Sequence, residues 1–168
     1  MTLQRTEMTP EALAAATFDE CGNAILRLAF SYLHNRQDAE DILQETVLQL
    51  IRTNPNLDTP AHRKAWLLTV AANKSKNLLK YNRYRMHDDA DELTLAAKMP
   101  AEESDVWQAV NALPEKYREV IHLFYAEGYS TAEIAKILGK RESTVRSLLC
   151  RGREKLKAVL KEAYDFAE

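Results

Sequence analysis

Short hydroxyls and guanidiniums alternate in one stretch near the C-terminus, ESTVRSLLCRGR at residues 142–153. A helix turns about 100° per residue, so these polar side chains gather on one side while Val145, Leu149 and Gly152 lie on the other. Arginine and short hydroxyl side chains can hydrogen-bond to base edges and phosphates. An ordinary helix with a solvated basic face is the alternative. We predict a helix that binds duplex DNA through Ser143, Thr144, Arg146, Ser147, Cys150 and Arg151.

A second group of side chains that could take part in chemistry is acidic and lies in the segment DAEDILQET at residues 38–46. Carboxylates can hold metal ions or perform acid–base catalysis. Here they fall on an expected exposed helix face, with no histidine and no apolar pocket beside them, so we predict no catalytic residue, no metal and no cofactor. The face is either simply solvated or a docking surface for a basic partner. Its side chains are Asp38, Asp41, Gln44 and Glu45.

A third group is basic. Residues 63–85 contain seven Lys or Arg and no Asp or Glu, and Tyr81 and Tyr84 lie among them. Aromatic rings among cations suit stacking on unpaired bases, although the tyrosines could equally belong to a core or its rim. Residues 88–105 then hold seven acids. A second basic stretch, residues 140–157, holds seven Lys or Arg and two acids. The net charge of −2 therefore conceals two basic stretches separated by an acidic one, a pattern typical of contact with one polyanion at two places.

The elements that would position the first group form a helix-turn-helix pattern. Ser130 can cap a helix while Glu133 reaches back to the Ser130 N–H, which makes a capping box. Ile134 and Leu138 supply the buried side, and Gly139 stands where a left-handed residue commonly ends a helix. The DNA-binding helix then begins within a few residues.

Helices account for most of the remaining chain, because four glycines and five prolines leave long stretches uninterrupted. A helix can start at Pro10, although Gly22 and Asn23 weaken its continuity, and a core-facing helix is expected to end near His34 and Asn35. A second helix opens at Asp38. A loop with two prolines and two asparagines follows at residues 53–60. A long helix over about residues 61–85 then carries the basic stretch.

Helical periodicity is lost over residues 86–103 and returns at Val106, which predicts a linker between two domains. The expected fold is all-α, with two small helical domains joined by a flexible acidic linker. The predicted segments are a tail and first-helix start at 1–17, a domain at 18–86, a linker at 87–103, a domain at 104–162 and a tail at 163–168.

Composition also limits the location of the protein. There is no apolar run near eighteen residues and no basic-then-apolar start, so we expect neither a membrane span nor a secretory signal, and a cytoplasmic protein. Cys21 and Cys150 lack the paired spacing of a zinc site and are expected to be reduced thiols.

Four motifs in a fixed order carry a family resemblance. They are DAEDILQET (38–46), AWLLTVAANKSKNLL (65–79), ALPEKYREVIHL (112–123) and STAEIAKILGKRESTVRSLLCRGREKL (130–156). With these motifs the chain resembles the extracytoplasmic-function sigma factors, small two-domain subunits that give bacterial RNA polymerase its promoter specificity. The resemblance implies a sigma region 2-like helical bundle in the first domain and a region 4-like four-helix domain with a helix-turn-helix in the second.

The resemblance also implies roles for the three groups. The acidic helix would dock on the clamp helices of the polymerase β′ subunit, and the C-terminal helix would bind the minus-35 element in the major groove. The loop after residue 53 would capture a flipped base of the minus-10 element, which the next helix would line. The minus-10 candidates are Asn54, Asn56, Asp58, Arg63, Lys64, Asn73, Lys76, Asn77 and Lys80.

Further partners implied by the resemblance are the polymerase β subunit, promoter DNA and an anti-sigma factor, and the protein would not be an enzyme. Three positions depart from the family pattern: Arg141 replaces a frequent capping Ser, and Ala72 and Leu148 replace frequent arginines. We expect each of the last two to remove a phosphate contact. The alternative function is a helix-turn-helix regulator of the response-regulator output type, which would explain the C-terminal half only.

Overall fold

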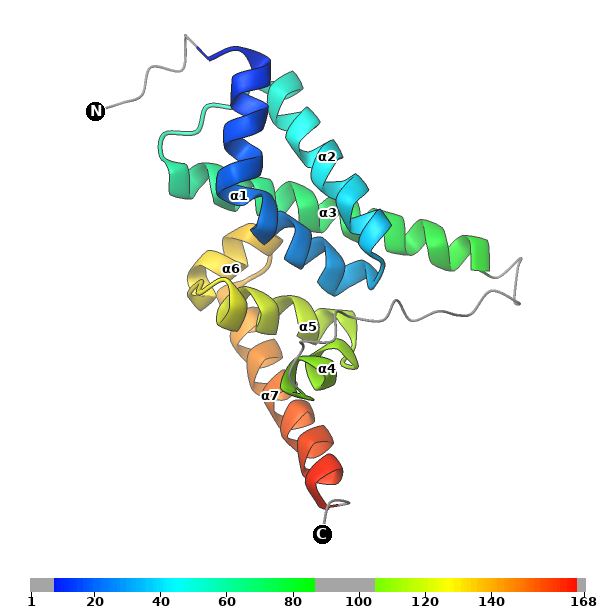
Figure 1. The fold of residues 1–168 in the computed structure, drawn as a ribbon. Coiled ribbons are helices and arrows are strands. Elements are labelled where there is room, and N and C mark those ends of the chain that lie inside the picture. Colours follow the sequence, from blue (N-terminus) through cyan, green and yellow to red (C-terminus); the bar gives the residue numbers. More distant parts are fainter. Residues whose placement is uncertain (1–7, 87–104, 166–168) are drawn as a thin grey trace. The chain divides into compact units, whose positions relative to one another are not determined.

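The computed structural model describes residues 8–86 and 105–165, which divide into two helical units (Figure 1). The first unit holds α1, α2 and α3, and the second holds α4, α5, η1, α6 and α7. The described ranges contain no β-strand. The predicted acidic linker lies outside them.

Side-chain caps begin the first two helices, α1 (Pro10–Leu33) and α2 (Arg36–Thr53). Thr9 Oγ1 accepts from the Ala12 N–H at 3.1 Å, and Asn35 Oδ1 accepts from the Asp38 N–H at 3.0 Å. The cap at Asn35 starts α2 two residues earlier than we predicted, so the predicted start at Asp38 is wrong.

The third helix, α3 (Pro60–Met86), follows a loop whose last residues form its cap. Thr59 Oγ1 accepts from the His62 N–H at 3.0 Å. The α1 helix packs against both α2 and α3 and runs unbroken through Gly22 (Figure 1). The buried side chains of this unit include Ile25, Leu28, Ala29, Tyr32, Ile42, Val47, Leu50, Leu67, Leu68 and Ala71. One side of each of α2 and α3 is therefore fixed in the core, and the other is left to solvent.

The second unit consists of short helices around one long one. These are α4 (Asp105–Asn111), α5 (Glu115–Ile121), the π-helical turn η1 (His122–Ala126), α6 (Thr131–Leu138) and α7 (Glu142–Asp165). The core includes Val110, Leu113, Val120, Ile121, Leu123, Ile134, Val145 and Leu149. Gly128, with φ 75°, follows η1 and turns the chain toward α6. The π turn was not predicted.

A close approach fixes α7 against α5. A Cβ atom on Gly152 would lie 2.9 Å from Ile121 Cδ1 and 3.4 Å from Tyr117 Cβ. Real Cβ atoms essentially never approach within 3.0 Å, so any larger residue at this position must displace Ile121. Glycine at position 152 therefore sets the separation of the two helices.

One basic side chain of the C-terminal stretch is turned inward. Lys140 Nζ lies 3.2 Å from Glu119 Oε1, and the Glu119 side chain is only 1% exposed. A buried carboxylate needs such a partner, because an unpaired buried charge is strongly destabilising. Lys140 is half-buried and pairs with a core carboxylate, so its charge is already partnered within the second unit.

Candidate nucleic-acid and polymerase interfaces

The turn before α7 is built as predicted. Ser130 Oγ accepts from the Glu133 N–H at 3.2 Å, and Glu133 Oε1 accepts from the Ser130 N–H at 3.1 Å. These hydrogen bonds hold the pKa of the Glu133 carboxyl below its usual value. Gly139 ends α6 in the left-handed region with φ 63°. The predicted capping box and glycine cap are both confirmed.

The first turn of α7 is tied back to α6. Thr131 Oγ1 donates to Glu142 Oε1 at 3.0 Å, which joins the start of one helix to the start of the other. Val145 N–H donates to the Arg141 carbonyl oxygen at 3.1 Å, so α7 is already helical where the polar face begins. The turn is thus held by hydrogen bonds even though Arg141 supplies no hydroxyl cap.

The polar face of α7 is exposed along its first three turns. Val145 and Leu149 are buried against the core. Leu148 is buried as well, so the expectation that an outward phosphate contact is lost there is wrong. The six predicted minus-35 residues are all exposed: Ser143, Thr144, Arg146, Ser147, Cys150 and Arg151.

The outer face of α2 carries the acidic group. Asp41, Gln44 and Glu45 are exposed, whereas Asp38 is half-buried at the first turn. The Gln37 amide donates to Asp41 Oδ1 at 3.3 Å, and Lys74 Nζ of α3 lies 3.8 Å from Glu45 Oε2. The carboxylates are therefore held in place by neighbouring side chains.

An exposed leucine in this acidic face was missed by the sequence reasoning. Leu48 is 45% exposed and follows Gln44 by one helical turn. It lines a shallow hollow together with Glu45, Gln49, Arg52, Thr53 and Lys74. An apolar side chain ringed by charges is typical of a protein-docking surface. A helical wheel of the sequence, on which Leu48 falls outside the apolar side, would have found it.

The candidate minus-10 residues divide between the loop and α3. Asn54, Asn56 and Asp58 are exposed in the loop, and Asn54 adopts a left-handed φ of 42°. On α3 the residues Asn73, Asn77 and Lys80 are exposed, and Arg63, Lys64 and Lys76 are half-buried.

Lys76 and Ala72 of α3 both lie against the core of the first unit. Lys76 Nζ lies 5.8 Å from the centroid of the buried Tyr32 ring, which anchors the lysine stem beside the exposed face. Ala72 is 1% exposed. The expectation that Ala72 removes a phosphate contact is therefore wrong, because the position faces the core.

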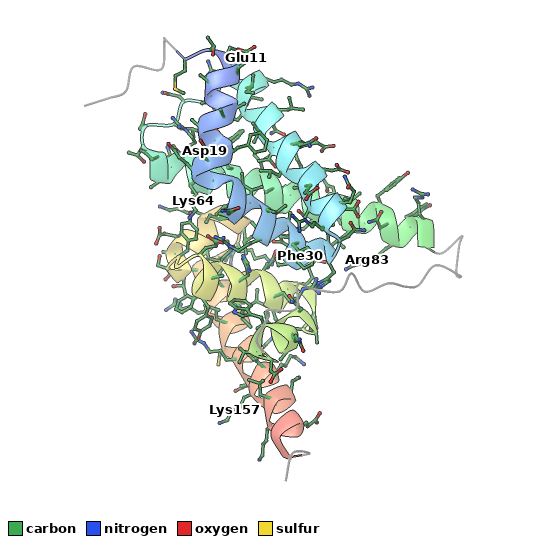
Figure 2. All side chains as sticks on the ribbon, viewed as in Figure 1. Glu11, Asp19, Phe30, Lys64, Arg83 and Lys157 are labelled. Carbon is green, nitrogen blue, oxygen red and sulfur yellow. The ribbon has the colours of Figure 1, made fainter. Side chains whose placement is uncertain are left out.

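A second hollow lies on α7 beyond the turns that carry the predicted minus-35 residues. Tyr125, Leu156 and Leu160 supply apolar walls, and Arg153, Lys157 and Lys161 line it with positive charge. Arg153 Nε donates to the Tyr125 hydroxyl at 2.7 Å, and the Arg153 guanidinium lies 5.3 Å from the Phe124 ring centroid. Figure 2 labels Lys157 on this part of α7. The π turn is thereby joined to α7.

Other classes of site receive no support from the described residues. Within residues 8–86 and 105–165, no cluster of three or more His, Cys, Asp or Glu is arranged to hold a metal ion. No helix in those ranges is long and apolar enough to span a bilayer. Both cysteines are free thiols, and burial together with the nearby Glu20 carboxylate raises the pKa of the Cys21 thiol.

Family models match both units. Residues 17–85 match sigma-70 region 2, and residues 103–156 match sigma-70, region 4. The alternative of a response-regulator type of regulator explains only the second of these matches and is not favoured. The predicted all-α fold with region 2-like and region 4-like parts is confirmed.

Named relatives agree with this assignment. The chain is 31% identical over 161 residues to the extracytoplasmic-function RNA polymerase sigma factor SigL of Mycobacterium tuberculosis, covering 90% of each chain. It is 28% identical over 150 residues to the RNA polymerase sigma factor SigV of Bacillus subtilis, covering 88% of this chain and 90% of SigV.

Solved structures show the same similarity. The sigma factor RpoE of Bartonella quintana, solved with the anti-sigma factor NepR, aligns with a TM-score of 0.71 and 27% identity over 88% of this chain and 96% of RpoE. CnrH, solved with the cytosolic domain of CnrY, aligns with a TM-score of 0.67 and 25% identity over 92% of this chain and 90% of CnrH. Taken with the helix-turn-helix geometry and the two family matches, these similarities show that the chain belongs to the extracytoplasmic-function sigma factors of the sigma-70 family, which direct bacterial RNA polymerase to promoters.

Proposed function

We propose that the two units divide promoter recognition between them. The first unit docks on the polymerase and holds the melted minus-10 element, and the second binds the minus-35 duplex. The main support for this division comes from the first turns of α7. All six polar residues there are exposed, and the apolar residues on the opposite side of the helix are buried in the core. A helix held in this way can enter the major groove and present short side chains and arginines to base edges.

The acidic face of α2 is the surface that binds the polymerase. Asp41, Gln44 and Glu45 surround the exposed Leu48, and Asp38 extends the face at the first turn. Charged residues around an apolar centre orient the two proteins and raise their rate of association, while the apolar side chain adds contact area. The partner is the β′ clamp helices of core RNA polymerase.

The loop and α3 bind the minus-10 element. Asn54, Asn56 and Asp58 offer amide and carboxylate groups that can hydrogen-bond to the edge of an extruded base. Asn73, Asn77 and Lys80 continue along the exposed side of α3, with Arg63, Lys64 and Lys76 at its margins. These cations favour the phosphates of a melted strand.

The hollow on α7 is the contact for the polymerase β subunit. Tyr125, Leu156 and Leu160 suit an apolar helix face, and Arg153, Lys157 and Lys161 suit acidic residues beside it. An anti-sigma factor that covered the hollow or the α2 face would block assembly with the polymerase. RpoE was solved with the anti-sigma factor NepR, and CnrH was solved with the cytosolic domain of CnrY. We place the protein in the cytoplasm with its polymerase, and assign it no catalysis of its own.

Co-purification with core RNA polymerase tests the docking surface. The triple variant Asp41→Asn/Glu45→Gln/Leu48→Ala should lose association, because it removes two charges and the apolar centre of the α2 face. Glu40→Gln is the matched control, since Glu40 pairs with Arg36 at 3.0 Å on the flank of the same helix. Association of the triple variant at the wild-type level, or an equal loss in the control, would remove α2 from the proposal.

A further inference from the structure

The turn between α6 and α7 is tied to α5 through one side chain. Lys140 stands in this turn, one residue after the cap Gly139 and two before Glu142, where α7 begins. Lys140 Nζ lies 3.2 Å from Glu119 Oε1, and the two side chains are 28% and 1% exposed. The Lys140 N–H also donates to the Ala135 carbonyl oxygen at 2.9 Å. Both the backbone and the side chain of Lys140 are therefore held immediately before α7.

The predicted minus-35 segment of α7, residues 143–151, lies between two contacts with α5. Figure 1 shows α5 packed across α7 within the second unit. Before the segment, Lys140 pairs with Glu119 of α5. After the segment, Gly152 allows α7 to approach Ile121 of α5. The position and the tilt of the segment relative to α5 are therefore set at both of its ends.

The pair is more directional than the other contacts at the start of α7. The apolar side of α7 is buried against the core, but the hydrophobic effect has no preferred direction. The hydrogen bond from Thr131 to Glu142 links α7 to α6, but it is exposed, where water competes for both groups. The Glu119 carboxylate is shielded from water, so its attraction to Lys140 is stronger at the same distance. The pair is thus the contact best able to fix where α7 starts.

Stability alone does not require an ion pair at this place. Replacing a buried ion pair with apolar residues of similar volume is often neutral or stabilising, because the charges no longer have to leave water. A charged pair can instead favour one arrangement of the elements that it joins. A binding surface needs its side chains held within about 0.5 Å of the productive geometry. The pair is therefore better suited to placing α7 than to stabilising the unit.

We propose that Glu119 and Lys140 are positioning residues for minus-35 recognition. Their pairing holds the start of α7 where Ser143, Thr144 and Arg146 reach base edges, and neither of the two contacts DNA. The inference rests on the proposed function of α7 in binding this element. Loss of the pair therefore lowers discrimination between promoter sequences rather than affinity for DNA in general.

The test compares Lys140→Gln with Lys140→Met in the holoenzyme. Both variants remove the charge and have similar size, but only glutamine keeps an N–H donor for Glu119. Binding is measured on two promoter duplexes selected from randomised templates, identical except that one has a scrambled minus-35 element. The ratio of their dissociation constants measures discrimination. Lys140→Met should lower this ratio about fivefold or more, as expected for loss of one base contact, whereas Lys140→Gln should stay close to the wild type.

The double variant Glu119→Met/Lys140→Met separates position from stability. Its second unit should unfold in urea at or above the wild-type midpoint, followed through Trp107 in a Trp66→Phe background. Its discrimination ratio should nevertheless be lowered as in Lys140→Met. A wild-type ratio would show that the pair acts only through stability and would overturn the inference. If the double variant does not fold, the comparison of Lys140→Gln with Lys140→Met still decides the question.

Any result in which the glutamine and methionine variants behave alike overturns the inference. Equal loss of affinity on both duplexes would make Lys140 a phosphate contact, and equal discrimination would leave the pair without an effect on recognition. The variant Arg146→Ala tests the underlying function separately and should lower the ratio by itself. A wild-type ratio in Arg146→Ala, or a wild-type holoenzyme that does not distinguish the two duplexes, would remove the proposed function of α7.

Discussion

We expect duplex recognition to depend most on Arg146 and Arg151. Both are exposed on α7, about 140° apart around the helix, with the exposed Ser147 and Cys150 between them. In the proposed complex the small side chains let the helix approach base edges closely, and the arginines reach guanine acceptors or phosphates. Residue types and spacing alone predicted this face, because outward polar residues require no packing partner. The expectation that Ala72 and Leu148 remove phosphate contacts rested on the arginines frequent in the family and not on exposure, which depends on which neighbouring helix covers a position.

Replacing either arginine with alanine should weaken binding of the holoenzyme to its promoter. The expected cost is about 1–3 kcal/mol where the guanidinium makes a bidentate base contact. Dissociation constants measured on a promoter selected from randomised templates would give this value. The control is Lys155→Ala, which removes one charge from α7 on the side opposite Arg146 and should cost less. Wild-type affinity in both arginine variants would move recognition away from α7.

At the scale of the helices, start and stop signals positioned the helix-turn-helix. Ser130, Glu133 and Gly139 make the hydrogen bonds and the left-handed turn that their types predict. These are local interactions, so a sequence can specify them. The π turn at residues 122–126 and the Glu119–Lys140 pair were not predicted, because each depends on side chains brought together by tertiary packing.

The capping box gives a pH dependence with a defined sign. The pKa of Glu133 is lower in the folded chain than in the unfolded chain, so its ionised carboxylate stabilises the fold. That stabilisation is fully present above the unfolded pKa of about 4.3 and is lost as the pH falls through the lowered folded value. The stability difference between wild type and Glu133→Ala, measured by urea unfolding, should therefore shrink below about pH 4. Glu154→Ala, outside the capping box, is the control, and a Glu133→Ala difference that grew in acid would contradict the assignment.

The contact at Gly152 predicts an unusual response to alanine. Replacing a glycine inside a helix with alanine normally stabilises the helix by about 1 kcal/mol. At position 152, however, the new Cβ would press on Ile121 Cδ1. Overpacking costs about 1–3 kcal/mol, so Gly152→Ala should destabilise the second unit. Ile121→Val removes the clashing carbon, and in that background the same change should become neutral or stabilising.

Urea unfolding can follow each unit through its own tryptophan. Trp66 lies in α3 and Trp107 in α4, so Trp66→Phe leaves a reporter for the second unit and Trp107→Phe leaves one for the first. The matched control is Gly22→Ala, where the added Cβ would lie 3.9 Å from Phe18 Cδ1, at ordinary contact distance. This control should stabilise the first unit. Stabilisation by Gly152→Ala in the wild-type background would show that α5 and α7 can separate without cost.

For the whole molecule, two small recognition units on one chain allow weak contacts to reinforce one another. In the proposed function each unit presents one surface to DNA and another to the polymerase, so binding through one unit raises the effective concentration of the other. The order of four motifs predicted this organisation and the family. A helical wheel of the sequence places Leu48 among the acidic side chains of α2, but its place in a hollow with Lys74 of α3 depends on how the two helices pack.

Transcription by purified core RNA polymerase, with and without this chain, tests the central claim most directly. The templates carry randomised upstream sequence, and those that yield transcripts are selected and sequenced. We predict transcripts from a fixed start only when the chain is present, and selected templates that share two short elements at a constant spacing. Transcription equal to that of core polymerase alone, or templates enriched in a single palindromic element bound by the chain without polymerase, would contradict the account.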